Sequence, residues 1–184
     1  MNLPNYLTLL RIILVPVFFT LLVSYGQGGA EKYRVWALTV FVIASLTDAM
    51  DGMVARFTNQ RTELGTFLDP LADKLLLLSG YLGILFVSNL PHHPPLWITV
   101  TIIFRDFVIV VGMLVIFIIT RKVKSVNPHW IGKVTTFFQM AGLAAILLKH
   151  DAAVWLWNIT AVLTILSGGV YIRRGIQALA KGSM

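Results

Sequence analysis

The chain has 184 residues, of which 57% are hydrophobic and only 12% are charged, and it contains no cysteine. This composition is typical of a membrane protein rather than of a soluble domain, and the lack of cysteine excludes disulfides and thiolate metal sites. A formal net charge of +7 indicates attraction to an anionic leaflet and to anionic ligands, rather than to nucleic acid.

Six apolar runs are long enough to cross a bilayer, which takes about 20 helical residues. They cover residues 7–25, 35–57, 64–88, 96–119, 131–148 and 152–172. A cleaved signal peptide is an alternative for the first run, but that run has no basic residue before Arg11, contains Pro16 and exceeds the usual apolar length. We therefore predict an all-α integral membrane protein, with residues 1–184 as a single domain of six transmembrane helices.

The orientation in the membrane follows from the basic residues of alternate loops. One set of loops, with the C-terminal segment, carries Arg61, Arg121, Lys122, Lys124, Arg173, Arg174 and Lys181. The opposite set has Lys32 and Arg34 beside Glu31, and Lys149 beside Asp151. This asymmetry predicts that both termini are cytoplasmic.

Half of the eight acidic residues are aspartates that lie between residues 48 and 73. They are Asp48, Asp51, Asp69 and Asp73. Helical residues three or four apart share a face, so each pair converges, and the short connection makes the second and third helices antiparallel neighbours.

One or two such acids could simply be solvated at helix ends. Four at one site repel one another, and each costs about 2.5 to 3.5 kcal/mol deep in a bilayer. We therefore expect a pair of divalent cations, because Mg²⁺, Mn²⁺ and Ca²⁺ prefer carboxylate ligands.

The neighbours of these acids suit phosphoryl transfer, in which two ions usually stabilise the attacking and leaving oxygens. Gly52 and Gly65 remove side chains where a base or a diphosphate would approach the backbone. Arg56 offers a bidentate donor for phosphate. Helix packing or interfacial anchoring would explain each of these residues alone.

Lys74 follows Asp73 and points about 100° away from it on a helix, which favours a structural role over a catalytic one.

Residues 48–73 read D-x2-D-G-x2-A-R-x8-G-x3-D-x3-D, which resembles the signature of the CDP-alcohol phosphatidyltransferases. The opening "NLPNYLTLLRIILVP" resembles the short amphipathic N-terminal segment and first helix of the bacterial phosphatidylglycerophosphate synthases and the related cardiolipin synthases. The later segments "IGKVTTFFQM" and "SGGVYIRRG" are also similar to theirs. The similarity therefore extends over nearly the whole chain.

The resemblance implies a homodimer of six-helix subunits in the bacterial inner membrane, with its active site facing the cytoplasm. Such an enzyme transfers a phosphatidyl group from CDP-diacylglycerol to an alcohol and releases CMP. Two ions, Mg²⁺ or Mn²⁺, would be held by Asp48, Asp51, Asp69 and Asp73. Asp73 would also deprotonate the acceptor hydroxyl. The CDP-diacylglycerol site would be formed by Gly52, Ala55, Arg56 and Gly65, with Arg56 gripping the diphosphate.

The acceptor is expected to be glycerol 3-phosphate, whose dianion needs cationic partners. Arg105 in the fourth helix and Lys133 at the start of the fifth are the candidates, with Arg173 or Arg174 as further ones. Arg105 could instead pair with Asp106, and Lys133 could be only a cytoplasmic anchor.

One feature favours another acceptor. "FRDFVIVVGM" has no second arginine, and in this it is closer to the cardiolipin synthases, which use phosphatidylglycerol. Inositol phosphate, serine and choline-type acceptors are less favoured.

Two other classes of protein use clustered acids in membranes. An intramembrane prenyltransferase carries its aspartate motifs on two distant loops, whereas these four acids lie within one short segment. A divalent-cation transporter places its acids at the bilayer midplane on broken or repeated helices, and no internal repeat is present here. Both alternatives are disfavoured.

Overall fold

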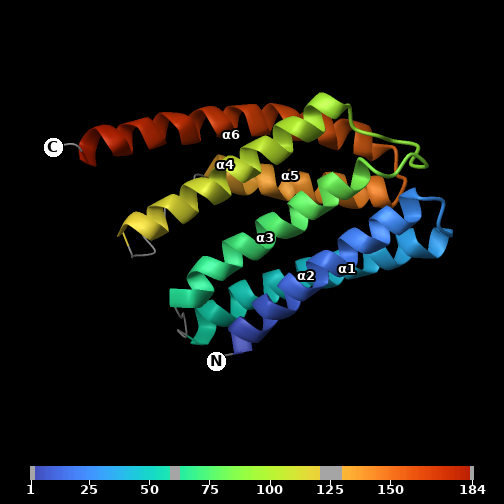
Figure 1. Cartoon of the computed structure of the whole chain (residues 1–184), viewed down its shortest axis with the longest axis horizontal. Helices are drawn as coiled ribbons and strands as arrows, with labels where there is room; N and C mark the ends of the chain where they lie inside the picture. The colour runs from blue at the N-terminus through green and yellow to red at the C-terminus, as the bar shows by residue number, and fades with distance from the viewer. Residues whose placement is uncertain (1–2, 59–62, 121–129, 183–184) are drawn as a thin grey trace.

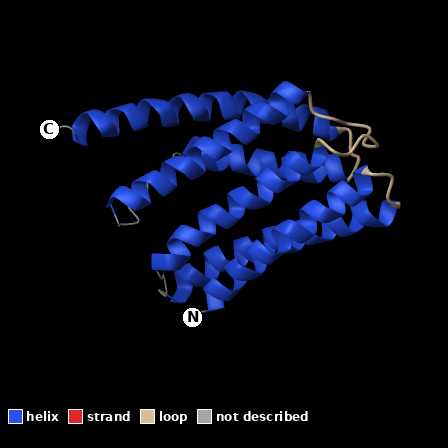
Figure 2. Cartoon of the chain, viewed as in Figure 1, coloured by secondary structure: helices blue, strands red, loops and turns tan. Residues whose placement is uncertain are grey.

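The computed structural model describes residues 3–58, 63–120 and 130–182, and the side chains of residues 6–48, 71–112, 115 and 130–171. In this part of the chain all regular secondary structure is helical (Figure 2). The helices are α1 (Leu3–Gly26), α2 (Glu31–Thr58), α3 (Glu63–Ile84), α4 (Leu96–Thr120), α5 (Trp130–Leu147) and α6 (Ala152–Gly182). The predicted all-helical class is thus confirmed.

Three stretches within the described residues are long and apolar enough to cross a membrane. They are Tyr6–Gly26, Trp130–Leu147 and Ala152–Tyr171. Large apolar side chains on the outside of the bundle, such as Phe104 and Trp155, agree with an apolar surrounding, because soluble proteins rarely expose apolar surface over extended areas.

Two helix ends differ from those predicted. α3 ends at Ile84 rather than near residue 88, because Leu85, Phe86 and Val87 donate to carbonyls three residues back and so tighten the chain into a 3₁₀-like turn. α6 continues to Gly182, well beyond its apolar part.

Consecutive helices run in opposite directions (Figure 1). The connections at 27–30, 85–95 and 148–151 meet at one end of the bundle, which we call the loop end, while α1 begins and α6 finishes at the other. α1 packs along both α2 and α3, α5 packs along α6, and α4 contacts α3 and α6. The bundle therefore has two groups, α1–α3 and α4–α6, with α3 in contact with both.

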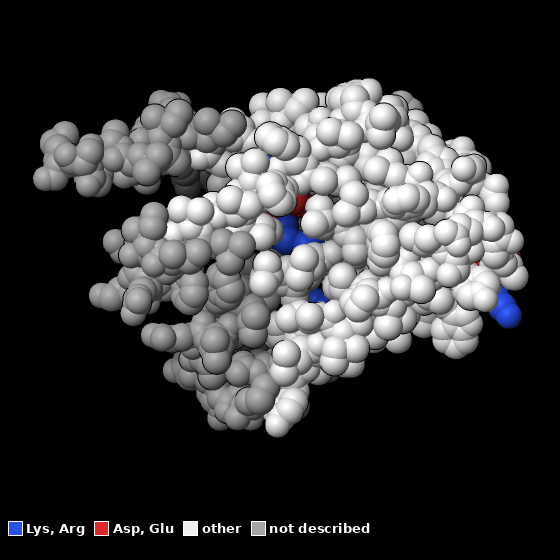
Figure 3. Space-filling model, in the orientation of Figure 1, with Lys and Arg blue, Asp and Glu red and all other residues white. Residues whose placement is uncertain are grey.

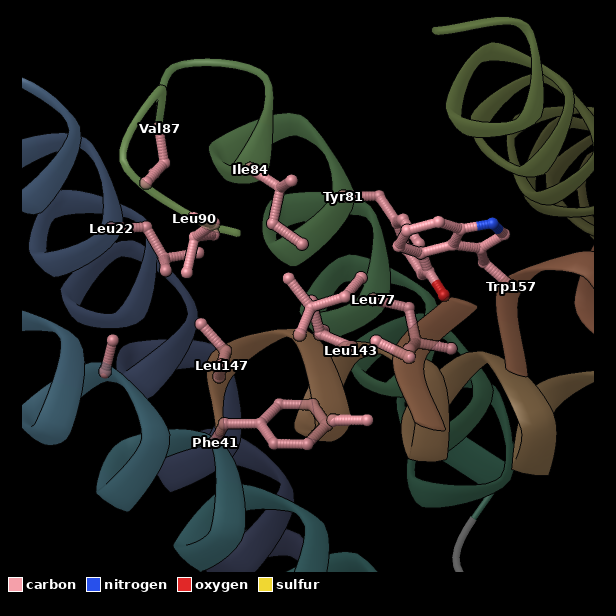
Figure 4. Close-up of a cluster of buried hydrophobic side chains, with 14 of the residues drawn as sticks. Leu22, Phe41, Leu77, Tyr81, Ile84, Val87, Leu90, Leu143, Leu147 and Trp157 are labelled. Atoms are coloured by element: carbon pink, nitrogen blue, oxygen red, sulfur yellow. The ribbon is translucent and has the colours of Figure 1, made fainter. Parts of the chain in front are cut away.

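The core lies where the two groups meet. Figure 4 shows Leu22 of α1, Phe41 of α2, Leu77 of α3 and Leu143 of α5 turned toward one another. Gly80 of α3 makes this contact possible, since a Cβ there would lie 2.4 Å from Leu143 Cδ2 and 3.1 Å from Phe18 Cε1. A small residue at such a crossing lets helix backbones approach closely, as is common in membrane bundles.

α5 ends in a Schellman motif, in which the final carbonyls are capped by backbone N–H groups of the turn that follows. The N–H of Lys149 donates to the Ile146 carbonyl at 3.0 Å, and that of His150 donates to the Ala145 carbonyl at 3.0 Å. Lys149 occupies the left-handed position of the motif with a φ of 57°, where glycine is the usual residue. Its side chain offsets this cost by pairing with Glu31 on α2, at 2.9 Å from Nζ to Oε1.

Ion pairs at the loop end join the two groups of helices. Glu31 accepts from Lys149 and also from Arg34 Nε at 2.5 Å, and Arg34 Nη1 donates to the Leu147 carbonyl. The hydrogen bond from Lys149, followed by that from Arg34, lowers the pKa of Glu31 from 4.5 to about 2. A depressed carboxyl pKa stabilises the fold above the unfolded value, so this contribution is complete above about pH 4.5 and is lost as the pH falls toward 2.

The left-handed backbone conformation of Lys149 predicts that alanine and glycine at this position give proteins of different stability. Lys149→Ala and Lys149→Gly both lose the pair with Glu31, but only alanine keeps the cost of a Cβ at positive φ. We expect the glycine variant to be more stable by about 1 kcal/mol in denaturant unfolding in detergent micelles.

Lys32 provides the control because it lies in the first turn of α2, where alanine should be at least as stable as glycine. The same order at both positions would show that the left-handed conformation of Lys149 carries no cost.

Candidate active site

Two groups of charged residues, one partly exposed and the other largely buried, meet α3 at consecutive positions. Asp73 faces α1 and α2, while Lys74 faces α4 and α5. Since neighbouring residues are rotated by about 100° around a helix axis, one turn of α3 contributes to both groups. We call Asp48 and Asp73 the acid pair, and Lys74, Arg105 and Asp106 the Lys74 cluster.

The acid pair shares one cationic nitrogen. Nη1 of Arg11, on α1, lies 2.7 Å from Asp48 Oδ1 on α2 and 2.9 Å from Asp73 Oδ1 on α3. The Arg11 side chain is fully buried. Because α1 packs along both α2 and α3, its guanidinium reaches the space between the two carboxylates.

The structure thus brings together two of the four predicted acids. Asp51 and Asp69 belong to α2 and α3, one helical turn from Asp48 and Asp73, and their side chains lie outside the described set. The same holds for the predicted nucleotide residues Gly52, Ala55, Arg56 and Gly65. Among the described side chains no group of three or more metal-ligating residues occurs.

The acid pair fits a divalent cation. Its oxygens come from two different helices and already converge on a single positive group. Carboxylate oxygens are the donors that hard ions such as Mg²⁺ and Mn²⁺ prefer.

The Lys74 cluster joins four helices through the contacts of its two cations. Oδ1 of Asp106, on α4, accepts from Arg105 Nη1 at 2.6 Å and from Lys74 Nζ at 3.0 Å. Lys74 also donates to Thr136 Oγ1 of α5 at 3.2 Å, and Arg105 donates to Ser167 Oγ of α6. The centroid of the Tyr171 ring lies 5.5 Å from the Arg105 guanidinium carbon, within the range of a cation–π contact.

Two polar atoms of the Lys74 cluster make no hydrogen bond to the described residues. Within the described part of the chain, Asp106 Oδ2 and Arg105 Nε are buried without a hydrogen-bond partner. Lys74 and Asp106 are among the residues around a cavity of about 30 Å³ whose accessible lining is apolar, and Figure 3 shows basic and acidic atoms in a hollow of an otherwise largely uncharged face. Because its lining is apolar, this cavity offers a water molecule no hydrogen-bond partner.

The two predicted acceptor residues are placed differently. Arg105 is buried in the cluster and paired with Asp106, which was the alternative considered for it. Lys133 is exposed on α5. The adjacent Gly132 is buried, and a Cβ there would lie 3.1 Å from the Tyr171 hydroxyl and 3.5 Å from Arg105 Nη2. The absence of a side chain at this position therefore leaves room for the arginine.

Sequence reasoning missed the role of Arg11. A signal was available, because Arg11 is the one charged residue of α1, and an arginine inside an apolar span needs a partner. The contributions of Thr136, Ser167 and Tyr171 were also missed, although these residues lie in the two later segments that resemble the family.

Residues 1–166 match the CDP-alcohol phosphatidyltransferase family. The chain belongs to this family. It is an enzyme of the phosphatidyltransferase class, as the motif at residues 48–73 predicted.

Curated bacterial relatives cover nearly the same length. A protein of Mycobacterium tuberculosis named probable phosphatidylglycerophosphate synthase is 37% identical over 96% of this chain and 82% of its own. A Bacillus subtilis protein named CDP-diacylglycerol–glycerol-3-phosphate 3-phosphatidyltransferase is 36% identical over 97% of both chains. An Escherichia coli protein of the same name is 37% identical over 90% of both.

The contrast between the two lysines of this phosphatidyltransferase is testable. Lys74→Met removes one of the two cations that Asp106 contacts, and we expect it to lower the free energy of unfolding by about 1.5 to 3 kcal/mol, the usual value of a charge-assisted hydrogen bond. Lys133→Met, the exposed control, should change it by less than about 0.5 kcal/mol. Equal losses in detergent-solubilised protein would contradict the assignment of Lys74 to a buried cluster.

Proposed function

We propose that the protein transfers the phosphatidyl group of CDP-diacylglycerol to a hydroxyl of glycerol 3-phosphate, producing phosphatidylglycerophosphate and CMP. The observation that carries this proposal is the full-length similarity to two bacterial relatives named for this reaction. The unbroken aspartate motif supports it.

Asp48, Asp51, Asp69 and Asp73 are proposed to hold two divalent cations, Mg²⁺ or Mn²⁺. The convergence of Asp48 and Asp73 on one cation in the structure supports this role. When bound, the ions supply positive charge to the diphosphate and lower the pKa of the acceptor hydroxyl. Asp73 takes the proton from that hydroxyl, whose oxygen then attacks the phosphorus bearing the diacylglycerol, and CMP leaves.

Gly52, Ala55, Arg56 and Gly65 are proposed to bind the donor. The three small residues leave room for cytidine beside the acids, and Arg56 pairs with the diphosphate. Support comes from the motif spacing, which places Gly52, Ala55 and Arg56 on α2 and Gly65 on α3, the same helices that carry the acids.

Arg105 is proposed to bind the acceptor phosphate. Its buried Nε has no hydrogen-bond partner among the described residues. Lys133 is a secondary candidate, because its exposed side chain belongs to the helix that also carries Gly132 and Thr136.

Phosphatidylglycerol is a second candidate acceptor, which would make the enzyme a cardiolipin synthase. The charges of the Lys74 cluster favour it, since two cations and one carboxylate leave a net charge of +1. That charge matches the single negative charge of a phosphodiester better than the dianion of glycerol 3-phosphate.

We further propose that the single domain crosses the bacterial inner membrane six times, with both termini and the acid pair toward the cytoplasm, and that it forms a homodimer. The antiparallel order of the helices supports the topology (Figure 1). The excess of Lys and Arg in one set of loops supports the orientation.

The reaction predicts divalent-dependent release of CMP. Purified protein supplied with labelled CDP-diacylglycerol and glycerol 3-phosphate should release CMP and form phosphatidylglycerophosphate only when Mg²⁺ or Mn²⁺ is present. Undiminished turnover in excess chelator would rule out the proposed use of metal.

The base assignment predicts that Asp73→Asn lowers turnover by about 10² to 10⁴, the usual contribution of general base catalysis. Affinity for CDP-diacylglycerol should fall much less, because the other three acids can still hold metal and nucleotide. Turnover and donor binding are measured separately, by single-turnover CMP release and by equilibrium titration. A variant with more than about a tenth of wild-type turnover would require another base.

The acceptor assignment predicts unequal effects of two charge removals. Arg105→Gln should weaken glycerol 3-phosphate binding by about 1.5 to 3 kcal/mol, whereas Lys133→Gln, at an exposed position, should weaken it less. Donor affinity should be unchanged in both. Formation of cardiolipin from phosphatidylglycerol, without phosphatidylglycerophosphate from glycerol 3-phosphate, would establish the second candidate instead.

A further inference from the structure

Arg11 occupies the position between the acids that a bridging metal ion would need. Its Nη1 lies 2.7 and 2.9 Å from one oxygen of each carboxylate, and both contacts use the same nitrogen. A divalent cation ligated by these two oxygens would lie within the space of that nitrogen. Ion and guanidinium therefore exclude each other sterically and also repel as like charges.

The burial of Arg11 makes this competition strong. Its side chain is fully buried, so water cannot take over the solvation of a displaced or unpaired charge. The acids in turn favour a cation, because two carboxylates held close together repel each other even where they are partly exposed. The site therefore needs one positive group in either state, with metal or without it.

We propose that Arg11 is an internal counter-cation for the acid pair, which it holds together in the metal-free protein and releases to the divalent cation when that ion binds. Arg11 is thus a positioning residue. It stabilises the fold without metal, and because it competes with the ion it lowers the affinity for metal. The inference rests on the metal-binding role proposed above for Asp48 and Asp73.

The decisive measurement is metal affinity after removal of the charge. Arg11→Met keeps a long apolar side chain but has no charge, and Arg11→Gln keeps a hydrogen-bond donor without the charge. Full-length protein in detergent micelles, free of nucleotide, is titrated with Mn²⁺, and free Mn²⁺ is followed by its electron paramagnetic resonance signal. Thermal unfolding is recorded with and without Mn²⁺.

Both variants should bind Mn²⁺ about tenfold tighter than wild type or better, since one neighbouring arginine changes the affinity of a carboxylate for a proton by a factor of about 10 or more. Without metal they should unfold at a lower temperature, and Mn²⁺ should raise that temperature more than it does in wild type. A purely structural arginine would lower thermal stability without increasing metal affinity.

Two further variants isolate the charge and its position. Arg11→Lys keeps a cation at the site and should retain an affinity near that of wild type. Arg34→Met removes the arginine that pairs with Glu31 at the loop end, and it should leave Mn²⁺ affinity unchanged. A gain in affinity in Arg34→Met would show that any loss of positive charge has the same effect, which would overturn the proposal.

The other outcomes also decide the question. Unchanged or weaker Mn²⁺ binding by Arg11→Met and Arg11→Gln would show that Arg11 does not compete with metal. If both variants stay unfolded even when Mn²⁺ is present during extraction, the ion cannot replace Arg11, and the proposal fails.

CMP release by wild type is measured in parallel, so that the two proposals fail separately. Metal-dependent release together with unimproved Mn²⁺ binding by the variants would reject only the counter-cation. Absence of release together with tighter Mn²⁺ binding would reject only the transferase assignment. A wild-type protein that binds no Mn²⁺ would reject the counter-cation and the metal site together.

Discussion

Arg11 is buried among apolar helices and finds its charged partners on two other helices, and the arrangement of this bundle depends on that pairing. Arg11 is the one charged residue of α1, and it meets Asp48 of α2 and Asp73 of α3. An unpaired arginine at such a depth would be costly. The close packing of α1 against both helices is therefore also the packing that neutralises its charge.

α3 extends the same principle to the second half of the protein. Asp73 turns toward α1 and α2, and the next residue, Lys74, turns toward Asp106 of α4 and Thr136 of α5. The contacts of Lys74 therefore tie α3 to α4 and α5 at the position next to the proposed base Asp73. The two groups of helices are thus coupled through adjacent residues, without a direct contact between the acid pair and Arg105 among the described side chains.

Sequence reasoning could predict the features that depend on local pattern. Apolar runs gave the helices, and helical spacing with a short connection brought Asp48 and Asp73 together. Sequence reasoning could not predict contacts between distant segments, because the partners of Arg11 depend on which helices pack against α1. Spacing also misleads for Arg105 and Asp106, since adjacent residues do not share a helix face, yet the long arginine side chain reaches the neighbouring carboxylate.

The acid pair with Arg11 and the Lys74 cluster have net charges of opposite sign. This difference suits catalysis at a position between them. In the acid pair one guanidinium faces two carboxylates, so the described charges sum to −1 and still attract a cation. In the Lys74 cluster two cations face one carboxylate, and the sum of +1 attracts an anion. A transferase that joins a metal-bound diphosphate to a phosphate-bearing alcohol needs both kinds of site close together. Because Asp73 and Lys74 are consecutive residues of one helix, α3 supplies a group to each site and fixes the distance between them.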